Sequence, residues 1–125
     1  MGKGISYWLE RFSDRMYERS GPATTYKAGL RYLRKGKYKE ALHQYSFAQR
    51  GFEDSLGPSD PWTITVMADR ALCYANLGQL ELAADLYQRA LHFETKARGG
   101  STARARAIQA QLELVRAGIT KSKSD

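Results

Sequence analysis

Few residues of this chain are suited to cross-linking or to crossing a membrane. Cys73 is the only cysteine among 125 residues, so no disulfide can form within the chain, and a reducing compartment such as the cytoplasm is expected. No apolar run approaches the roughly 20 residues that a membrane-spanning helix needs. The first fifteen residues carry charges where a secretory signal needs a continuous apolar region. These absences favour a soluble globular chain of one domain with a modest core.

Residues suited to catalysis are equally scarce. His43 and His92 are the only histidines, and neither has cysteine or carboxylate partners at the spacing of a metal site. The segment GGSTAR, residues 99–104, is glycine-rich but lacks the GxxxxGK[ST] spacing of a phosphate-binding loop. It also follows a predicted helix, whereas such a loop follows a strand. We therefore expect no enzymatic activity, no cofactor and no metal.

Basic residues outnumber acidic ones. The chain has 20 lysines and arginines against 13 aspartates and glutamates, a formal net charge of +7. This excess favours an acidic partner. It does not distinguish between an acidic peptide, a nucleic acid and an anionic membrane surface. No aromatic-rich strand platform or known RNA-recognition motif is present, so we expect nucleic-acid binding to be at most non-specific.

One stretch of the sequence occurs twice. GKYKEALHQYSFA, residues 36–48, returns as GQLELAADLYQRA, residues 78–90. The matching pairs lie 42 residues apart: Gly36 and Gly78, Ala41 and Ala83, Tyr45 and Tyr87, Ala48 and Ala90. Each glycine follows an apolar helical segment and suits the left-handed residue that ends a helix. The alanines and the tyrosine share one face of the next helix, where small residues let a neighbour approach. A fixed period of this length predicts stacked helix–turn–helix units.

The pattern resembles the tetratricopeptide repeat, and more narrowly the long-period type found in kinesin light chains, over about residues 23–98. The tyrosines, the turn glycines and the small residues match that family, as does the linker LGPSDPWT at residues 56–63. The resemblance implies an all-α fold: a short right-handed superhelical array of helix–turn–helix repeats with about six helices.

Five segments are predicted along the chain. They are an N-terminal amphipathic helix within residues 1–22 (a degenerate half repeat), repeats at 23–61 and 62–100, a capping helix at 101–119 and a disordered tail at 120–125. Inside the repeats, helices are expected at about 23–35, 37–55, 62–77 and 79–97. The loop GPSDP, residues 57–61, separates the two repeats, because its two prolines cannot continue a helix.

The N-terminal helix is expected at residues 5–19. Its apolar arc would bury Trp8 and Phe12 against the first repeat, at Tyr26, Leu30 or Leu33. Alternatively, this helix is released to bind a partner or a membrane surface. The first six residues also satisfy the myristoylation pattern with Gly2 as the acceptor, and a membrane role is expected only if Gly2 is acylated.

The C-terminal helix is expected at residues 103–118, where a third repeat would begin. Its apolar face carries Ala105, Ile108, Leu112, Val115 and Ile119. Its other face carries Arg106, Gln109, Glu113 and Arg116, which suits a solvated cap on the array.

A partner-binding groove follows from the resemblance, since the first helix of each repeat lines the concave side of such arrays. The implied groove residues are Tyr26, Lys27, Leu30, Leu33, Arg34, Asp69, Leu72, Ala75 and Asn76, with Arg106 and Gln109 closing the end. This mixed apolar and basic surface suits an acidic and apolar peptide or helix. Lys27 and Asp69 stand where the kinesin light chain type usually has asparagines that hold peptide backbone, so cargo specificity is not carried over. An alternative is that the N-terminal helix covers the groove.

The sequence therefore predicts a non-catalytic protein-interaction module, an adaptor or regulatory subunit that binds a peptide segment of a partner. The alternative is a small basic structural subunit of a larger assembly, RNA-containing or membrane-attached. The chain has fewer than three full repeats, so a partner or a second copy of the chain is also expected as a way to cover the ends of the array.

Overall fold

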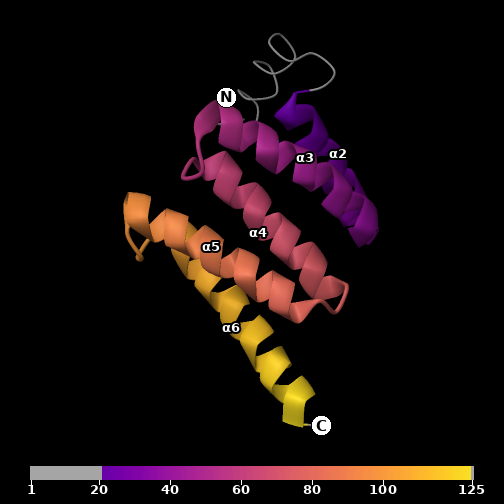
Figure 1. The fold of residues 1–125 in the computed structure, drawn as a ribbon, viewed down its shortest axis with the longest axis vertical. Coiled ribbons are helices and arrows are strands. Elements are labelled where there is room, and N and C mark those ends of the chain that lie inside the picture. The colour runs from indigo at the N-terminus through magenta and orange to yellow at the C-terminus, as the bar shows by residue number, and fades with distance from the viewer. Residues whose placement is uncertain (1–20, 125) are drawn as a thin grey trace.

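The structure is a computed structural model that describes residues 21–124. The predicted helix at residues 5–19 and the acceptor Gly2 lie outside these residues. The described chain forms five α-helices: α2 (Pro22–Arg34), α3 (Tyr38–Leu56), α4 (Pro61–Asn76), α5 (Leu80–Arg98) and α6 (Ala103–Ser124). Each helix packs against the helices before and after it, and the array runs from α2 and α3 to α6 at the opposite end (Figure 1). The all-α repeat architecture is therefore confirmed, and the four helices of the two repeats lie within one residue of their predicted bounds.

The two turns inside the repeats have the same backbone. Gly36 and Gly78 adopt φ angles of +73° and +81°, which a residue with a side chain rarely adopts. After α2, the N–H of Lys37 donates to the carbonyl of Tyr32 at 2.9 Å, and the N–H of Gly36 donates to that of Leu33 at 3.0 Å. This pair of bonds is a Schellman motif, and α4 ends with the equivalent pair. The predicted left-handed glycines are confirmed.

The helices that follow the longer linkers begin at side-chain caps. Oδ1 of Asp60 accepts a hydrogen bond from the Trp62 N–H at 2.8 Å and caps α4. Oγ1 of Thr102 accepts one from the Ala105 N–H at 3.0 Å and caps α6. Asp60 and Thr102 lie 42 residues apart, so the repeat extends into the linkers. Each cap satisfies a backbone donor that would otherwise lack a partner at the helix start.

The first repeat is built around Tyr45. Its ring lies so close to the α2 backbone that a Cβ at Gly29 would stand 2.4 Å from Cε1 of the ring. Only glycine at this position lets α2 and α3 approach so closely. The rest of this core consists of Ala41, Ala48, Phe52, Val66 and Cys73. Burial raises the pKa of the Cys73 thiol to about 11, so this cysteine is a packed core residue, as expected.

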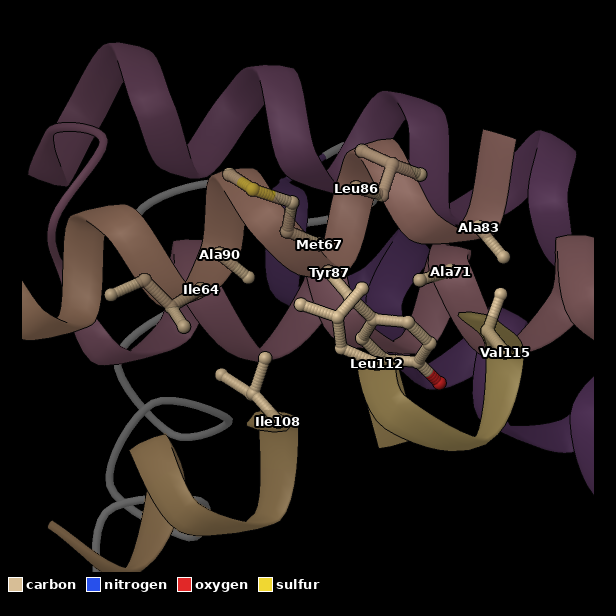
Figure 2. Close-up of a cluster of buried hydrophobic side chains, with 10 residues drawn as sticks. All are labelled: Ile64, Met67, Ala71, Ala83, Leu86, Tyr87, Ala90, Ile108, Leu112 and Val115. Atoms are coloured by element: carbon tan, nitrogen blue, oxygen red, sulfur yellow. The ribbon is translucent and has the colours of Figure 1, made fainter. Parts of the chain in front are cut away.

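A second core holds α4, α5 and α6 together (Figure 2). It comprises Ile64, Met67 and Ala71 from α4, Ala83, Leu86, Tyr87 and Ala90 from α5, and Ile108, Leu112 and Val115 from α6. The alanines at 83 and 90 flank Tyr87, as in the first repeat, so the predicted wedge of one aromatic between small residues is confirmed.

The prediction of a disordered tail at residues 120–125 is wrong for the described part of that range. Helix α6 continues to Ser124, six residues past its expected end at 118. No proline or glycine follows Gly118 to stop the helix, and Lys121 and Lys123 in its last turn complement the negative end of the helix dipole. Charge and low hydrophobicity suggested disorder, but the local backbone preferences favour continuing the helix.

The two longer linkers are held by different chemistry at equivalent positions. After the first repeat, the rings of Phe52 and Trp62 stack with their centroids 5.8 Å apart. Forty-two residues later these positions are Glu94 and Arg104, which form an ion pair at 3.3 Å. The Glu94 side chain is fully buried, and it also accepts hydrogen bonds from Arg98 at 2.9 Å and Thr102 at 2.8 Å. A buried ionic cluster thus replaces an aromatic pair.

Candidate functional site

The most distinctive polar contact of the predicted groove joins two repeats. The Tyr26 hydroxyl of α2 donates a hydrogen bond to Oδ2 of Asp69 in α4 at 3.1 Å. These residues are 43 positions apart in the sequence, so the bond forms only when the repeats stack. The structure therefore brings together the first and second repeats' predicted groove residues at this point.

Burial dominates the electrostatics of this contact. It raises the pKa of Asp69 to about 6, although the hydrogen bond from Tyr26 acts in the opposite direction. It also raises the pKa of the Tyr26 hydroxyl, and the nearby Asp69 carboxylate adds to that rise. Tyr26 is thus a neutral donor across the physiological pH range, whereas Asp69 changes its charge close to that range.

Tyr45 lies directly beside this pair. Its ring centroid is 5.7 Å from that of Tyr26, and its side chain is fully buried. Its hydroxyl has no hydrogen-bond partner within the described chain. Burial raises its pKa, and Asp69 is the charged group that raises it most. Sequence reasoning treated Tyr45 only as a core wedge and missed that its hydroxyl belongs to the same polar group as Asp69. We refer to Tyr26, Tyr45 and Asp69 as the Asp69 site.

The remaining groove predictions on α2 and α4 differ in exposure. Leu33 and Ala75 are half-buried and pack against the two cores. Arg34 and Asn76 are exposed, and the Asn76 amide donates to the Leu72 carbonyl at 2.9 Å. The other members, Lys27, Leu30 and Leu72, are half-buried.

Arg106 and Gln109 occupy a different place from the other predicted groove residues. They line a separate hollow between α5 and α6 of about 310 Å³, together with Leu91, Thr95, Gly100, Ala105, Ala110 and Glu113. In the 42-residue register they correspond to Ile64 and Met67, which α4 buries in the second core. The structure thus places Arg106 and Gln109 on the α6 face where a further helix would pack, and not beside the Asp69 site.

Leu114 is a residue that the sequence analysis missed. It lies 42 residues after Leu72 and 84 after Leu30, so the three leucines hold equivalent positions on α6, α4 and α2. Its side chain is 66% exposed, the largest value among the exposed large apolar residues of the described chain. The repeat register itself was the signal that would have identified it.

A second hollow lies between α4 and α5. Its volume is about 500 Å³, and it is lined by Arg70, Tyr74, Leu82, Asp85, Leu86, Gln88, Arg89, His92 and Phe93. None of the residues that line this hollow is a lysine. Arg70 reaches from α4 to α3, where its Nη1 donates a hydrogen bond to Oε1 of Gln49 at 2.8 Å. Both histidines, His43 and His92, are exposed, as expected for surface positions.

Between residues 21 and 124, no group of three histidine, cysteine, aspartate or glutamate side chains is arranged to hold a metal ion. In that same part of the chain, no helix combines the length and apolar character needed to span a bilayer.

Comparison with known proteins agrees with the repeat architecture. No curated protein matches the sequence. The family model of the tetratricopeptide repeat matches residues 22–93, which is more than half of the chain. This range begins at the first residue of α2 and ends within α5, so it spans both helical hairpins. The chain belongs to the tetratricopeptide repeat family.

Proposed function

We propose that this protein is a non-catalytic adaptor or regulatory subunit that binds a peptide segment of a partner protein along α2 and α4. Tetratricopeptide repeats are in general protein–protein interaction modules, and the family is not an enzymatic one. The observation that carries the proposal is the Tyr26–Asp69 hydrogen bond, which makes the predicted groove positions of two repeats neighbours. A peptide lying along these helices would contact both repeats at once.

The surface chemistry supports a peptide of mixed character. Leu30 and Leu72 are half-buried and Leu114 is exposed, so apolar side chains of a peptide can cover them. Arg34 is exposed and Lys27 is half-buried, so acidic side chains of the peptide would pair with them. Each of these side chains belongs to a first helix of the array, the kind of helix that lines the concave side.

The test uses a peptide array to find binding sequences, followed by fluorescence anisotropy with purified variants. Arg34→Glu and Leu114→Ser are expected to weaken the recovered peptides roughly 10-fold each, because each loses about 1.4 kcal/mol of contact. Arg50→Glu and Leu82→Ser are matched controls, since these side chains are also exposed but lie on α3 and α5. Equal losses in the test and control variants would contradict binding along the first helices.

The alternative function is a small basic subunit of a larger assembly. The net charge of +7 and the polar outer face of α6 support it. Native mass spectrometry of material from the source organism separates the two proposals. A stoichiometric complex supports the subunit, whereas a free monomer argues against it. If the protein binds RNA, a tenfold rise in salt should lower the binding constant by about one logarithmic unit for each phosphate that is neutralised. Such a salt dependence would indicate only non-specific contacts.

A further inference from the structure

Asp69 carries a charge that the described chain does not balance. Oδ2 of its carboxylate accepts one hydrogen bond, from the neutral Tyr26 hydroxyl. The ion pairs within residues 21–124 both involve Glu94, and none involves Asp69. A largely buried carboxylate is costly unless a cation or several donors compensate for the water it has lost. Among the described residues, Asp69 therefore lacks a positively charged partner.

A second observation points to the same place. The Tyr45 hydroxyl is buried without a hydrogen-bond partner in the described chain, and it lies beside Tyr26 and Asp69. Buried polar atoms in folded proteins are nearly always paired, and each exception calls for an explanation such as a water or a ligand. One group with several donors could satisfy both the free carboxylate oxygen and the Tyr45 oxygen.

The surroundings are aromatic. The Tyr26 ring contacts the Tyr45 ring at 5.7 Å and meets the edge of Trp62 at 5.6 Å between centroids. Aromatic rings attract cations, and the planar guanidinium of arginine packs on them more often than the ammonium of lysine does. Arginine also presents five N–H donors in a fixed plane, which suits two acceptors on one side.

We propose that the Asp69 site binds an arginine side chain of the peptide partner, with Asp69 as the acidic anchor and the Tyr45 hydroxyl oxygen as a second acceptor. This inference rests on the proposed function, because it assumes a peptide along α2 and α4. It adds a basic residue to the acidic and apolar peptide expected there. The acidic residues of the peptide would pair with Arg34 and Lys27, while one arginine enters between the two repeats.

The charged and titratable neighbours define how binding depends on pH. They are Tyr26 and Arg34 from α2, Tyr45 from α3, Arg70 and Cys73 from α4, and Tyr87 from α5. The tyrosine and cysteine groups keep their protons well above pH 7, since burial raises their pKa values. Asp69, with a pKa of about 6, is thus the group that changes charge in the accessible range. Arginine binds the ionised carboxylate, so affinity should rise with pH through about 6.

The experiment uses the full chain and a fluorescein-labelled peptide library in which one position is fixed as arginine or as its neutral analogue citrulline. At pH 7.5 we expect arginine peptides to bind roughly 10-fold or more tightly than citrulline peptides, as a hydrogen-bonded charge pair implies. Asp69→Asn keeps the shape and an acceptor for Tyr26, and it should abolish this preference. Tyr45→Phe should reduce the preference. Asp85→Asn, an exposed aspartate on α5, should leave it unchanged.

The outcomes separate this inference from the proposed function. Peptides that bind and are weakened by Arg34→Glu, but that show no preference for arginine over citrulline, would overturn the arginine site and leave the groove intact. An NMR titration of the free full-length protein provides an independent check. We expect the Asp69 carboxyl to titrate near pH 6, and a value below 4 would show that a cation within the chain already occupies the site, which overturns the proposal.

Discussion

Glu94 offers the sharpest test of how this array is held together. Its carboxylate is fully buried at the junction of α5 and α6, where Arg98, Thr102 and Arg104 donate hydrogen bonds to it. The substitution Glu94→Gln keeps the shape and one acceptor oxygen but removes the charge and turns the other oxygen into a donor. That new N–H₂ group would face arginine and threonine donors, so at least one hydrogen bond is lost.

The expected cost follows from the exposure of the partners. Removing one member of a fully buried ion pair costs about 3–5 kcal/mol, because the remaining charge stays buried. Here the side chains of Arg98 and Arg104 are 31% and 36% exposed, so both can turn toward water after the substitution. We therefore expect a smaller loss of about 2–3 kcal/mol, comparable to one or two charge-assisted hydrogen bonds.

The loss should depend on pH in a defined direction. Burial alone would raise the pKa of Glu94, but the Thr102 hydrogen bond and the charges of Arg104 and Arg98 outweigh it and hold this pKa below its usual value. The ionised carboxylate is therefore favoured in the folded state. Its stabilisation is complete above the unfolded-state pKa of about 4.3 and disappears as the pH falls through the folded-state value.

Urea denaturation followed by circular dichroism measures this effect at pH 7 and pH 3. We expect the Glu94→Gln midpoint to fall at pH 7 with an unchanged slope, and the difference from the parent protein to shrink at pH 3. Glu113→Gln is the matched control, because this glutamate is exposed on α6. A change at pH 7 no larger than the control's, or a loss of equal size at both pH values, would refute the role given to the Glu94 charge.

Four further substitutions test the packing and one helix cap. Gly29→Ala should lower the free energy of unfolding by about 2 kcal/mol in thermal unfolding, because the added Cβ would stand 2.4 Å from the Tyr45 ring. Gly118→Ala is the control and should be neutral or stabilising, because the close neighbour of its Cβ is the flexible end of Leu80 at 3.1 Å. Tyr45→Phe should leave the unfolding free energy within about 0.5 kcal/mol of the parent value, as the lost hydroxyl has no partner in the described chain; a large loss would show a hidden hydrogen bond. Asp60→Ala should lower the free energy of unfolding by about 1 kcal/mol in urea denaturation, because it removes the hydrogen-bond acceptor of the Trp62 N–H. An unchanged free energy would show that water replaces the cap.

The sequence alone determined the repeat and the helices. Gly36 and Gly78 end helices through bonds that reach only five residues back, so their effect is local and readable from the chain. The 42-residue period then requires the units to stack, because one helical hairpin cannot bury its own apolar face. The same local reasoning failed at the C-terminus, where charged residues suggested a disordered tail but no residue stops α6 before Ser124.

Only the tertiary structure decided which side chains meet across the repeats. Tyr26 and Asp69 are 43 residues apart, and their hydrogen bond depends on how far α4 is rotated and shifted against α2. The replacement of the Phe52–Trp62 stack by the Glu94–Arg104 ion pair is visible as letters in the repeat register, yet its meaning depends on the full burial of Glu94. Periodicity assigns a residue to a face of its helix within a few tens of degrees. Hydrogen bonds and buried charges depend on distances of a few tenths of an ångström, which only the packed helices define.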